Sequence, residues 1–257
     1  MRLDLFLVKK SLAGSREKAK EFILSGNVTV DGKVCLKSAF EVEENEVLLN
    51  SEEEAMVGRG GKKLLKAIDL FEINLSGAVC LDAGASTGGF TEQMIKHGGA
   101  KVYAVDVGTD QLAEVLKNDK RVVNLEKTDI RNLELSEKAD FFTADVSFIS
   151  LTQILYHLKR LSKDNAEGVC LIKPQFEAGR EHVGKKGVVK DKKVHIKVIN
   201  DITSFAEALG FKIKGITHSP ISGQNGNIEY LMYLGISGDG ITPDTEKTVN
   251  EAWEELK

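Results

Sequence analysis

The sequence has only three cysteines and no long apolar stretch, and each shortage excludes a class of protein. Cys35, Cys80 and Cys170 lie far apart and form no CxxC pair, which argues against a disulfide framework or a zinc site and fits a reducing compartment. Nowhere do 18 apolar residues follow one another, so we expect no membrane-spanning helix. The N-terminal segment MRLDLFLVKKSLAGSREKAK is too charged for a signal peptide. These absences predict a cytoplasmic protein that binds neither a membrane nor a metal.

Charge is distributed in blocks along the 257 residues, although the net charge is only −4. Residues 1–37 hold eight Lys or Arg against four Asp or Glu, residues 38–54 hold seven Glu and no base, and residues 55–66 hold four bases. This change in composition places a domain boundary near residues 50–60. The predicted domains are a small one over 1–55, a main one over 60–240 and a C-terminal helix over 241–257.

The first block predicts two short helices followed by a β-hairpin. Apolar residues in RLDLFLVKK are consistent with a short buried helix, and Ser15 can cap a second helix that ends at Gly26. In NVTVDGKVCL, apolar and polar residues alternate around Asp31–Gly32, a strong signal for a tight hairpin turn. A domain of about 50 residues has a marginal core, so we expect a small accessory module.

After residue 60, segments with a strand pattern alternate with segments with a helix pattern. Strands are predicted over residues 78–82, 101–106, 121–125, 140–145, 167–172, 211–218 and 228–236. Helices are predicted over residues 60–71, 88–97, 110–117, 150–161, 191–209 and 243–256. Such alternation is typical of an α/β fold with a parallel sheet.

The segment VCLDAGASTGGFTEQM, residues 79–94, is an apolar strand followed by a Gly-rich loop that leads into a helix. A dinucleotide-binding loop needs GxGxxG, but Ser86 stands where the middle glycine must let the backbone approach the pyrophosphate. A P-loop needs GxxxxGK, and Phe90 replaces the lysine that holds the phosphates. Both phosphate-binding hypotheses fail, because in each motif the residue needed for contact with the phosphates is replaced.

A ligand without phosphates fits this loop better. Backbone amides at the start of the helix favour a small anion such as an amino-acid carboxylate, and Asp82 can accept from an ammonium group. The next strand ends in Asp106, 24 residues after Asp82, where an acid is expected to bind ribose hydroxyls. S-adenosylmethionine has a carboxylate, an ammonium group and a ribose but no phosphate. The predicted cofactor residues are Asp82, Gly84, Ser86, Thr87, Gly88 and Asp106. A purely structural strand–helix turn stays as the alternative.

Six motifs make the chain resemble a known family. They are RGGKKL (59–64), DAGASTGGFT (82–91), VYAVDVGTDQL (102–112), DVSFISL (145–151), KPQFEAGREHVGKKGVV (173–189) and GNIEYL (226–231). Together they resemble the TlyA, or hemolysin A, family of FtsJ-like RNA 2′-O-methyltransferases, over nearly the whole chain. The resemblance implies a class I, Rossmann-like methyltransferase sheet. It also implies 2′-O-methylation of cytidine, with S-adenosylmethionine as donor, in 16S or 23S ribosomal RNA or both.

The first block resembles the small α+β RNA-binding module named after ribosomal protein S4. The resemblance rests on RLDLFL and SREKAKEFILSGNVTVDGK. It implies that Arg2, Ser15, Arg16 and Lys18 contact RNA, and that the partner is ribosomal RNA or a ribosomal subunit. Without the resemblance, this local positive charge would indicate a solvated surface.

Related 2′-O-methyltransferases use a Lys–Asp–Lys–Glu tetrad, which the resemblance assigns to Lys63, Asp145, Lys173 and Glu229. Methyl transfer to a hydroxyl is an in-line displacement that needs orientation and one general base. A lysine can be that base only if burial or a neighbouring cation lowers its pKa from about 10.4. We expect Lys173 to be the base, Asp145 to orient it, and Lys63 and Glu229 to position the ribose. Lys62 is the alternative to Lys63 as the first lysine of the tetrad.

Further residues surround this predicted site. Asp129 follows the third strand, where it either contacts the adenine or caps a helix. Phe148 and Phe176 flank the site and either stack on a flipped base or pack in the core. Residues 173–197 hold eight bases against three acids, and a basic loop of this kind can track phosphates. The remaining predicted RNA contacts are Arg59, Arg180, Lys185 and Lys186.

Three other functions compete with this hypothesis. A membrane-active hemolysin has little support without a spanning segment or a secretion signal. A non-catalytic RNA-binding or ribosome assembly factor would not need an intact tetrad. A methyltransferase for proteins or small molecules would need neither the basic loop nor the N-terminal module.

Overall fold

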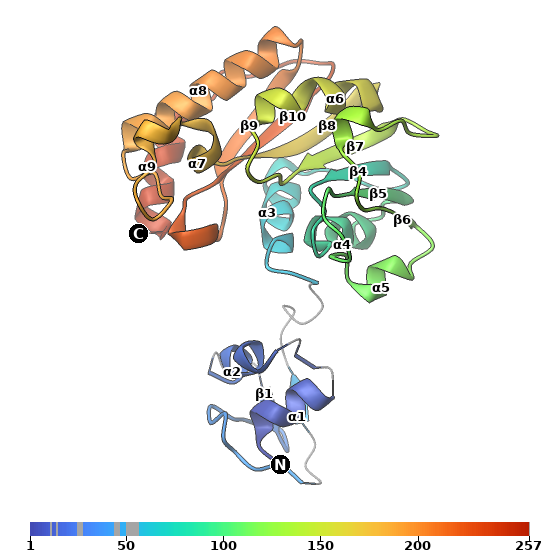
Figure 1. Ribbon diagram of the computed structural model, residues 1–257, viewed down its shortest axis with the longest axis vertical. Helices are drawn as coiled ribbons and strands as arrows, with labels where there is room; N and C mark the ends of the chain where they lie inside the picture. The colour runs from blue at the N-terminus through green and yellow to red at the C-terminus, as the bar shows by residue number, and fades with distance from the viewer. Residues whose placement is uncertain (11, 14, 25–27, 44–46, 50–56, 257) are drawn as a thin grey trace. The chain divides into compact units, whose positions relative to one another are not determined.

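Figure 1 shows a computed structural model, which describes residues 1–10, 12–13, 15–24, 28–43, 47–49 and 57–256. The chain divides into two compact units, Met1–Val57 and Gly58–Lys257. Each unit contains its own cluster of buried apolar side chains.

The N-terminal unit consists of two helices and a three-stranded antiparallel sheet. Helices α1 (Leu3–Lys9) and α2 (Arg16–Leu24) pack together, and the strands β1 (Val28–Val30), β2 (Lys33–Val34) and β3 (Val47–Leu49) have the order β2-β1-β3. Asp31 and Gly32, with φ of 50° and 75°, form the turn between β1 and β2. Both residues adopt the left-handed conformation that a tight hairpin requires. The predicted helix pair and hairpin are confirmed, whereas Gly26 lies outside the described residues.

The second unit is built on a seven-stranded sheet with the order β6-β5-β4-β7-β8-β10-β9. Its strands are β4 (Val79–Ala83), β5 (Lys101–Val105), β6 (Val122–Leu125), β7 (Ala139–Ala144), β8 (Ser162–Ile172), β9 (Lys212–His218) and β10 (Tyr230–Gly235). Strands β4 to β8 are parallel, and β10 runs antiparallel between β8 and β9. The predicted α/β class is therefore confirmed, with one antiparallel strand that the sequence pattern did not distinguish.

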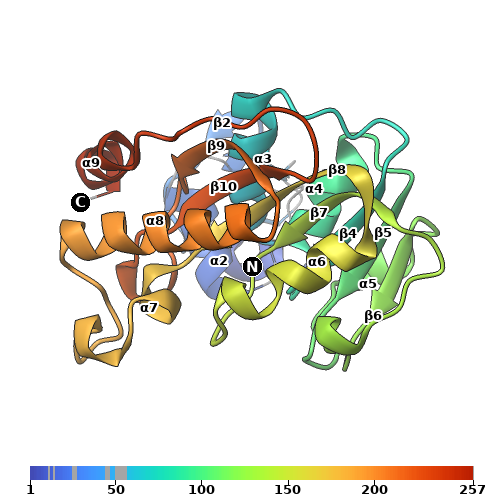
Figure 2. The same ribbon diagram turned by 90° about the horizontal axis from the view of Figure 1, so that it is seen from above.

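Helices cover both faces of this sheet, as Figure 2 shows from above. One face packs against α6 (Leu155–Leu161), α8 (Lys192–Ala208) and α9 (Thr245–Leu256), and the other packs against α3 (Gly61–Phe71) and α4 (Gly89–Lys96). Neighbouring residues of a strand point to opposite faces. Thus Leu81 and Phe142 lie in the first apolar layer, and Cys80 and Phe141 lie in the second. Two apolar layers hold the strand ends in fixed positions.

Two predicted helices differ from the structure for identifiable reasons. Over 110–117, only α5 (Glu114–Lys117) is helical, because the backbone N–H groups of residues 110–112 donate to the carboxylate of Glu126. Over 150–161, a 3₁₀ turn at Leu151–Gln153, capped by the Ser150 hydroxyl, precedes α6. The short helix α7 (Pro174–Glu177) was not predicted.

Strand β8 begins at Ser162, five residues earlier than predicted. Within the ranges that the structure describes, no helix is both long and apolar enough to cross a membrane.

Candidate active site

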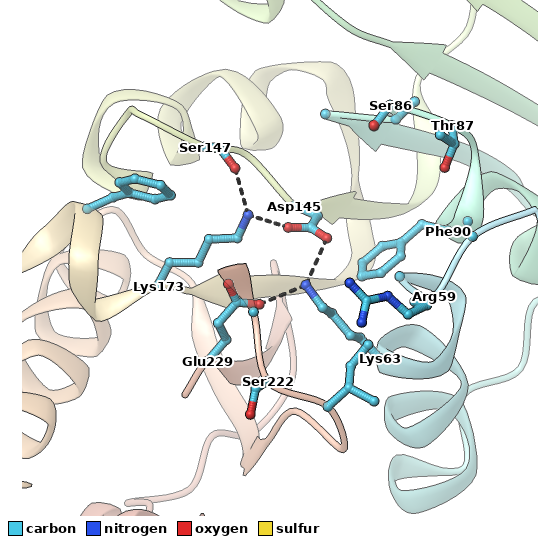
Figure 3. A pocket seen from close by; sticks show the side chains of 18 of the residues that line it. Arg59, Lys63, Ser86, Thr87, Phe90, Asp145, Ser147, Lys173, Ser222 and Glu229 are labelled. Atoms are coloured by element: carbon cyan, nitrogen blue, oxygen red, sulfur yellow. Dashed lines mark hydrogen bonds and ion pairs between the residues drawn. The ribbon is translucent and has the colours of Figure 1, made fainter. Parts of the chain in front are cut away.

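Four charged side chains from distant parts of the chain meet at one edge of the sheet. Asp145 follows the last residue of β7, Lys173 follows the last residue of β8, and Lys63 lies in α3. Glu229 directly precedes β10, and the antiparallel pairing of Tyr230 with Ile172 puts the start of β10 beside the end of β8. The sheet topology therefore gathers all four residues of the predicted tetrad, as Figure 3 shows.

The tetrad forms a continuous chain of alternating charges. The Lys63 ammonium lies 2.7 Å from Glu229 Oε2 and 3.3 Å from Asp145 Oδ2. The Lys173 ammonium lies 2.5 Å from the other carboxylate oxygen of Asp145, Oδ1. Lys63, Lys173 and Glu229 are each less than a tenth exposed, so these charges are stabilised by one another rather than by water.

Lys63 and Asp145 are both held in their charged forms, and the two lysines of the tetrad differ in their number of carboxylate partners. Burial disfavours the Lys63 ammonium, but Asp145 and Glu229 outweigh burial and raise the pKa of Lys63 above its usual value. Burial also opposes ionisation of Asp145, yet the ammonium groups of Lys173 and Lys63 hold the pKa of Asp145 below its usual value. Among the described residues, Lys173 has one carboxylate partner where Lys63 has two. In the part of the chain that the structure describes, Lys173 therefore has fewer carboxylate partners than Lys63.

Two residues that the sequence reasoning missed complete this polar cluster. Ser147 Oγ accepts a hydrogen bond from Lys173 at 3.0 Å, and Gln175 Nε2 donates to Glu229 Oε1 at 3.3 Å. Each lies two residues after a tetrad member within a quoted motif, which is the signal that could have found them. Lys62 does not line the cavity that contains Lys63.

Glu177 connects the two longest motifs. Its Oε2 accepts from the Ser150 hydroxyl at 2.6 Å, and its Oε1 accepts from the backbone N–H of Leu151 at 2.9 Å. Burial raises the pKa of this carboxyl, although the two hydrogen bonds oppose the rise. Glu177 was assigned no role from the sequence. In the structure it fixes the loop that contains Asp145 against the short helix that follows Lys173.

Two adjoining cavities open at this edge of the sheet. The tetrad cavity, about 370 Å³, contains the four tetrad residues together with Arg59, Ser86, Thr87 and Phe90. The β5 cavity, about 420 Å³, is lined by Asp106, Val107, Asp129, Ile130 and Phe148 among others. Both volumes fall in the range of small-molecule sites. The two cavities share Gly84, Ser86, Asp145 and Ser147, so a single ligand can extend across both.

Gly84 forms the junction between the two cavities. Its φ is 82°, and a Cβ placed on it would lie 2.7 Å from the backbone oxygen of Asp145. A side chain here would be strained and would also push against the segment that carries Asp145. The position needs glycine because β4 and the loop after β7 approach each other closely.

Asp106 and Asp129 lie along the β5 cavity. Asp106 accepts from the backbone N–H groups of Ser86 at 2.8 Å and Gly108 at 2.7 Å. Since a carboxylate has about four acceptor positions, Asp106 retains capacity for a ligand hydroxyl. Asp129 caps the turn Ile130–Asn132 by accepting from the Arg131 N–H at 2.9 Å. The cap, one of the two alternatives from the sequence, is therefore present, and Asp129 also lines the β5 cavity; its contact with adenine stays a prediction.

Two predicted cofactor residues lie outside both cavities, which corrects their expected placement. Asp82 is completely buried, and its oxygens accept from the hydroxyls of Thr91 at 2.7 Å and Thr143 at 2.9 Å. Burial raises the pKa of Asp82 to about 6, against the opposing effect of these hydroxyls. Asp82 lines neither cavity, so the contact with an ammonium group stays a prediction. Gly88, with φ of 99°, is buried where a Cβ would collide with Leu116, so it serves packing.

The predicted RNA contacts of this unit lie near the tetrad or on exposed loops. Arg59 lines the tetrad cavity, and Arg180 lines a small recess beside it. Lys185 and Lys186 are exposed in the loop that follows Arg180.

In the N-terminal unit, Arg2 and Arg16 share one buried partner. Both lie 3.0 Å from Asp4, whose side chain is completely buried, while the arginines stay 40% and 44% exposed. Burial opposes ionisation of Asp4, but the two arginines hold its pKa below the usual value. The pairing orders the arginines and leaves part of each guanidinium open to solvent. Ser15 is exposed directly before α2, and the Lys18 side chain lies outside the described residues.

Comparison with known proteins agrees with this geometry. The family described as "FtsJ-like methyltransferase" matches residues 56–236, and the family described as "S4 domain" matches residues 1–48. The chain is 40% identical over 261 residues to the 16S/23S rRNA (cytidine-2′-O)-methyltransferase TlyA of Mycobacterium tuberculosis, and the match covers 97% of each protein.

Solved structures show the same architecture. A Streptococcus thermophilus protein described as a possible hemolysin is 39% identical, with a TM-score of 0.76 over 99% of this chain and 96% of that one. An S-adenosylmethionine-dependent methyltransferase from Mesorhizobium loti is 12% identical, with a TM-score of 0.51 over 69% of this chain and 100% of that one. The second similarity is one of fold alone.

Proposed function

Because the chain belongs to the FtsJ-like methyltransferase family and contains an S4 domain, we propose that it transfers a methyl group from S-adenosylmethionine to the 2′-hydroxyl of a cytidine in ribosomal RNA. The observation that carries the proposal is the chain Glu229–Lys63–Asp145–Lys173 in the wall of a cavity. The choice of acceptor is supported by the relative from Mycobacterium tuberculosis, whose name gives 16S/23S rRNA and cytidine-2′-O.

The shared border of the two cavities suits the methyl donor. The proposal puts the adenosine part in the β5 cavity, with its ribose hydroxyls on Asp106 and its adenine near Asp129. The amino-acid part then lies along the loop Gly84–Thr87. Gly84 supports this arrangement because its missing Cβ leaves the junction open. When bound, S-adenosylmethionine supplies an electrophilic methyl group on a sulfonium.

Lys173 is the proposed general base. Its ammonium nitrogen lies at the border of the two cavities, next to Asp145 and Ser147, which line both. In its neutral amine form, Lys173 Nζ would accept the proton of the 2′-hydroxyl, and S-adenosylmethionine would supply the methyl group that this oxygen takes. Lys63, held protonated between two carboxylates, positions the ribose instead. Asp145 then stabilises the ammonium that forms on Lys173.

The S4 domain and the basic residues support a large RNA as acceptor. The N-terminal unit presents Arg2 and Arg16 with part of each side chain exposed, and Arg180, Lys185 and Lys186 are exposed after α7. Lysine and arginine contacts to phosphates give affinity that falls steeply with salt. We propose ribosomal RNA or a ribosomal subunit as the partner and the cytoplasm as the location.

The decisive experiment uses methyl-labelled S-adenosylmethionine and ribosomal RNA from a strain that lacks the protein. Each subunit is offered both assembled and as naked RNA, and ribose methylation is mapped at nucleotide resolution. We expect label on a cytidine 2′-oxygen with the wild type and a loss of at least about 100-fold in rate with Lys173→Ala. Lys247→Ala, at an exposed lysine of α9 outside the cavities, is the matched control. Absence of label on all four substrates would refute the function.

A further inference from the structure

A third recess borders the tetrad cavity at α7. It is lined by Gln175, Phe176, Gly179, Arg180 and Val183, and it shares Gln175 and Phe176 with the tetrad cavity. Its volume, about 370 Å³, equals that of the tetrad cavity. This α7 recess contains no tetrad residue and no residue of the cofactor loop, so methyl transfer itself does not account for it.

The walls of the α7 recess have the chemistry that binds an unpaired nucleobase. Phe176 provides an aromatic ring, and its other neighbours are the Lys173 ammonium, 5.9 Å from the ring centroid, and the Phe148 ring, 5.1 Å between centroids. Arg180 provides an exposed guanidinium for which no ion pair occurs among the described residues. Unpaired bases stack on aromatic rings and on arginine, whereas paired bases are not available for such stacking.

Gly179 shapes the recess. Its φ is 80°, and a Cβ placed on it would come within 2.8 Å of both Glu181 carboxylate oxygens. The chain turns here without a side chain, between Phe176 and Arg180. The Glu181 carboxylate therefore occupies the space where a side chain at Gly179 would begin.

Gln175 lies in the wall between the recess and the tetrad cavity, and it lacks one hydrogen bond. Since the Glu229 carboxylate only accepts, the Gln175 amide must turn its nitrogen toward Glu229. The amide oxygen then points away, and it is buried without a donor among the described residues. A buried acceptor without a donor is unfavourable.

We propose that the α7 recess binds the nucleobase of the nucleotide adjacent to the one that is methylated. The RNA then lies at the site as an unpaired strand, with the target ribose in the tetrad cavity and its neighbour's base stacked on Phe176. The inference rests on the proposed function for the identity of the strand as RNA. It adds that the enzyme recognises at least two consecutive unpaired nucleotides.

The test measures binding of short nucleotides to the full-length protein, with S-adenosylhomocysteine present. The probes are cytidine 5′-monophosphate and the dinucleotides CpA and ApC, followed by NMR of the backbone amides. We expect one dinucleotide to bind on the order of 5- to 100-fold more tightly than the mononucleotide, the range for stacking one base. The amide signals of Gly179 and Val183 should shift only with the dinucleotide, whereas that of Ser147 should shift with both.

Two variants and two matched controls test whether the tighter binding of the dinucleotide depends on the α7 recess. Phe176→Leu and Arg180→Ala should each reduce the dinucleotide advantage, Phe176→Leu to less than about threefold. Phe205→Leu, on a partly exposed ring of α8, and Arg121→Ala, beside β6, should retain the wild-type advantage because both positions lie outside all three cavities.

Several outcomes would overturn the inference. They are equal binding of mononucleotide and dinucleotides, unmoved Gly179 and Val183 signals, an undiminished advantage in Phe176→Leu, and no binding of any dinucleotide at millimolar concentration. The rRNA methylation assay above decides the proposed function separately. If rRNA is methylated but dinucleotides bind no more tightly than the mononucleotide, the proposed function stands and only base binding in the α7 recess is refuted.

Discussion

Replacing Lys63 with methionine removes the cation that lies between Glu229 and Asp145. The substitution keeps much of the side-chain volume, so its main effect is electrostatic. Glu229 is 3% exposed and would keep a buried carboxylate without its 2.7 Å partner. Breaking a buried ion pair from one side costs about 3–5 kcal/mol, compared with at most about 1 kcal/mol for an exposed pair. With a urea dependence of about 2–3 kcal/mol per molar, the unfolding midpoint should fall by about 1–2 M.

The loss should depend on pH with a definite sign. In the variant, a proton on the buried carboxyl relieves the unpaired charge, so the folded chain binds more protons than the unfolded chain. The variant's deficit should therefore shrink as the pH falls from 8 to 5. Asp145 keeps Lys173 as a partner in the variant, and this ammonium still lowers the pKa of the Asp145 carboxyl. Lys63→Met combined with Glu229→Gln should recover part of the loss, since the uncompensated charge is gone.

The chain offers a convenient probe and control for this measurement. Trp253, its single tryptophan, lies in α9, so its fluorescence follows the unfolding of the second unit alone. Lys62→Met changes the preceding residue of the same helix and should alter the free energy of unfolding by no more than about 1 kcal/mol. The reasoning fails if Lys63→Met unfolds within about 0.3 M urea of the wild type at pH 8, or if its deficit is equal at pH 5 and pH 8.

Three further predictions concern Gly84, Glu126 and Asp82. Gly84→Ala should weaken binding of S-adenosylhomocysteine at least about tenfold by calorimetry, since the new methyl group meets the Asp145 backbone; unchanged affinity would contradict the close approach. Glu126→Gln should raise the KM for S-adenosylmethionine severalfold with kcat nearly unchanged, because the carboxylate that orders residues 110–112 is lost; a fall in kcat alone would argue against it. Asp82, with its pKa raised to about 6, contributes stability that is full below its unfolded pKa of about 3.9 and is lost as the pH rises through 6. Relative to the wild type, Asp82→Asn should thus gain about 2–3 kcal/mol between pH 4 and pH 7, and a constant difference would refute the raised pKa.

Local patterns predicted most of the sheet but could not predict the direction of its last strands. Alternating apolar residues indicate that β9 and β10 are strands, yet nothing in such a pattern shows that β10 is inserted antiparallel between β8 and β9. The direction of β10 decides where Glu229 lies. Only the antiparallel direction brings the start of β10, and with it Glu229, to the edge where β7 and β8 end.

The predicted helix boundaries were wrong where a side chain, and not a helical carbonyl, accepts the backbone hydrogen bonds. The pattern over 110–117 favours a helix, but Glu126, far along the sequence, takes the N–H groups of the first residues. The sequence pattern also did not reveal that Asp82 is buried. An acid at the end of a strand beside a glycine-rich loop suggests a ligand contact, and only the packed structure shows that Thr91 and Thr143 enclose it.

By itself, the sequence predicted the class of protein and the order of most of its elements, and its motifs gave the tetrad with Lys62 as an alternative to Lys63. Those properties depend on local periodicity and on motifs, which are written in consecutive residues. The tertiary structure alone decided which residues meet. Lys63 rather than Lys62 lines the tetrad cavity, Ser147 contacts Lys173, Gln175 contacts Glu229, and Asp82 is buried between Thr91 and Thr143. Contacts of this kind depend on strand direction, burial and distance between segments far apart in the chain, and none of these is a property of a short stretch of sequence.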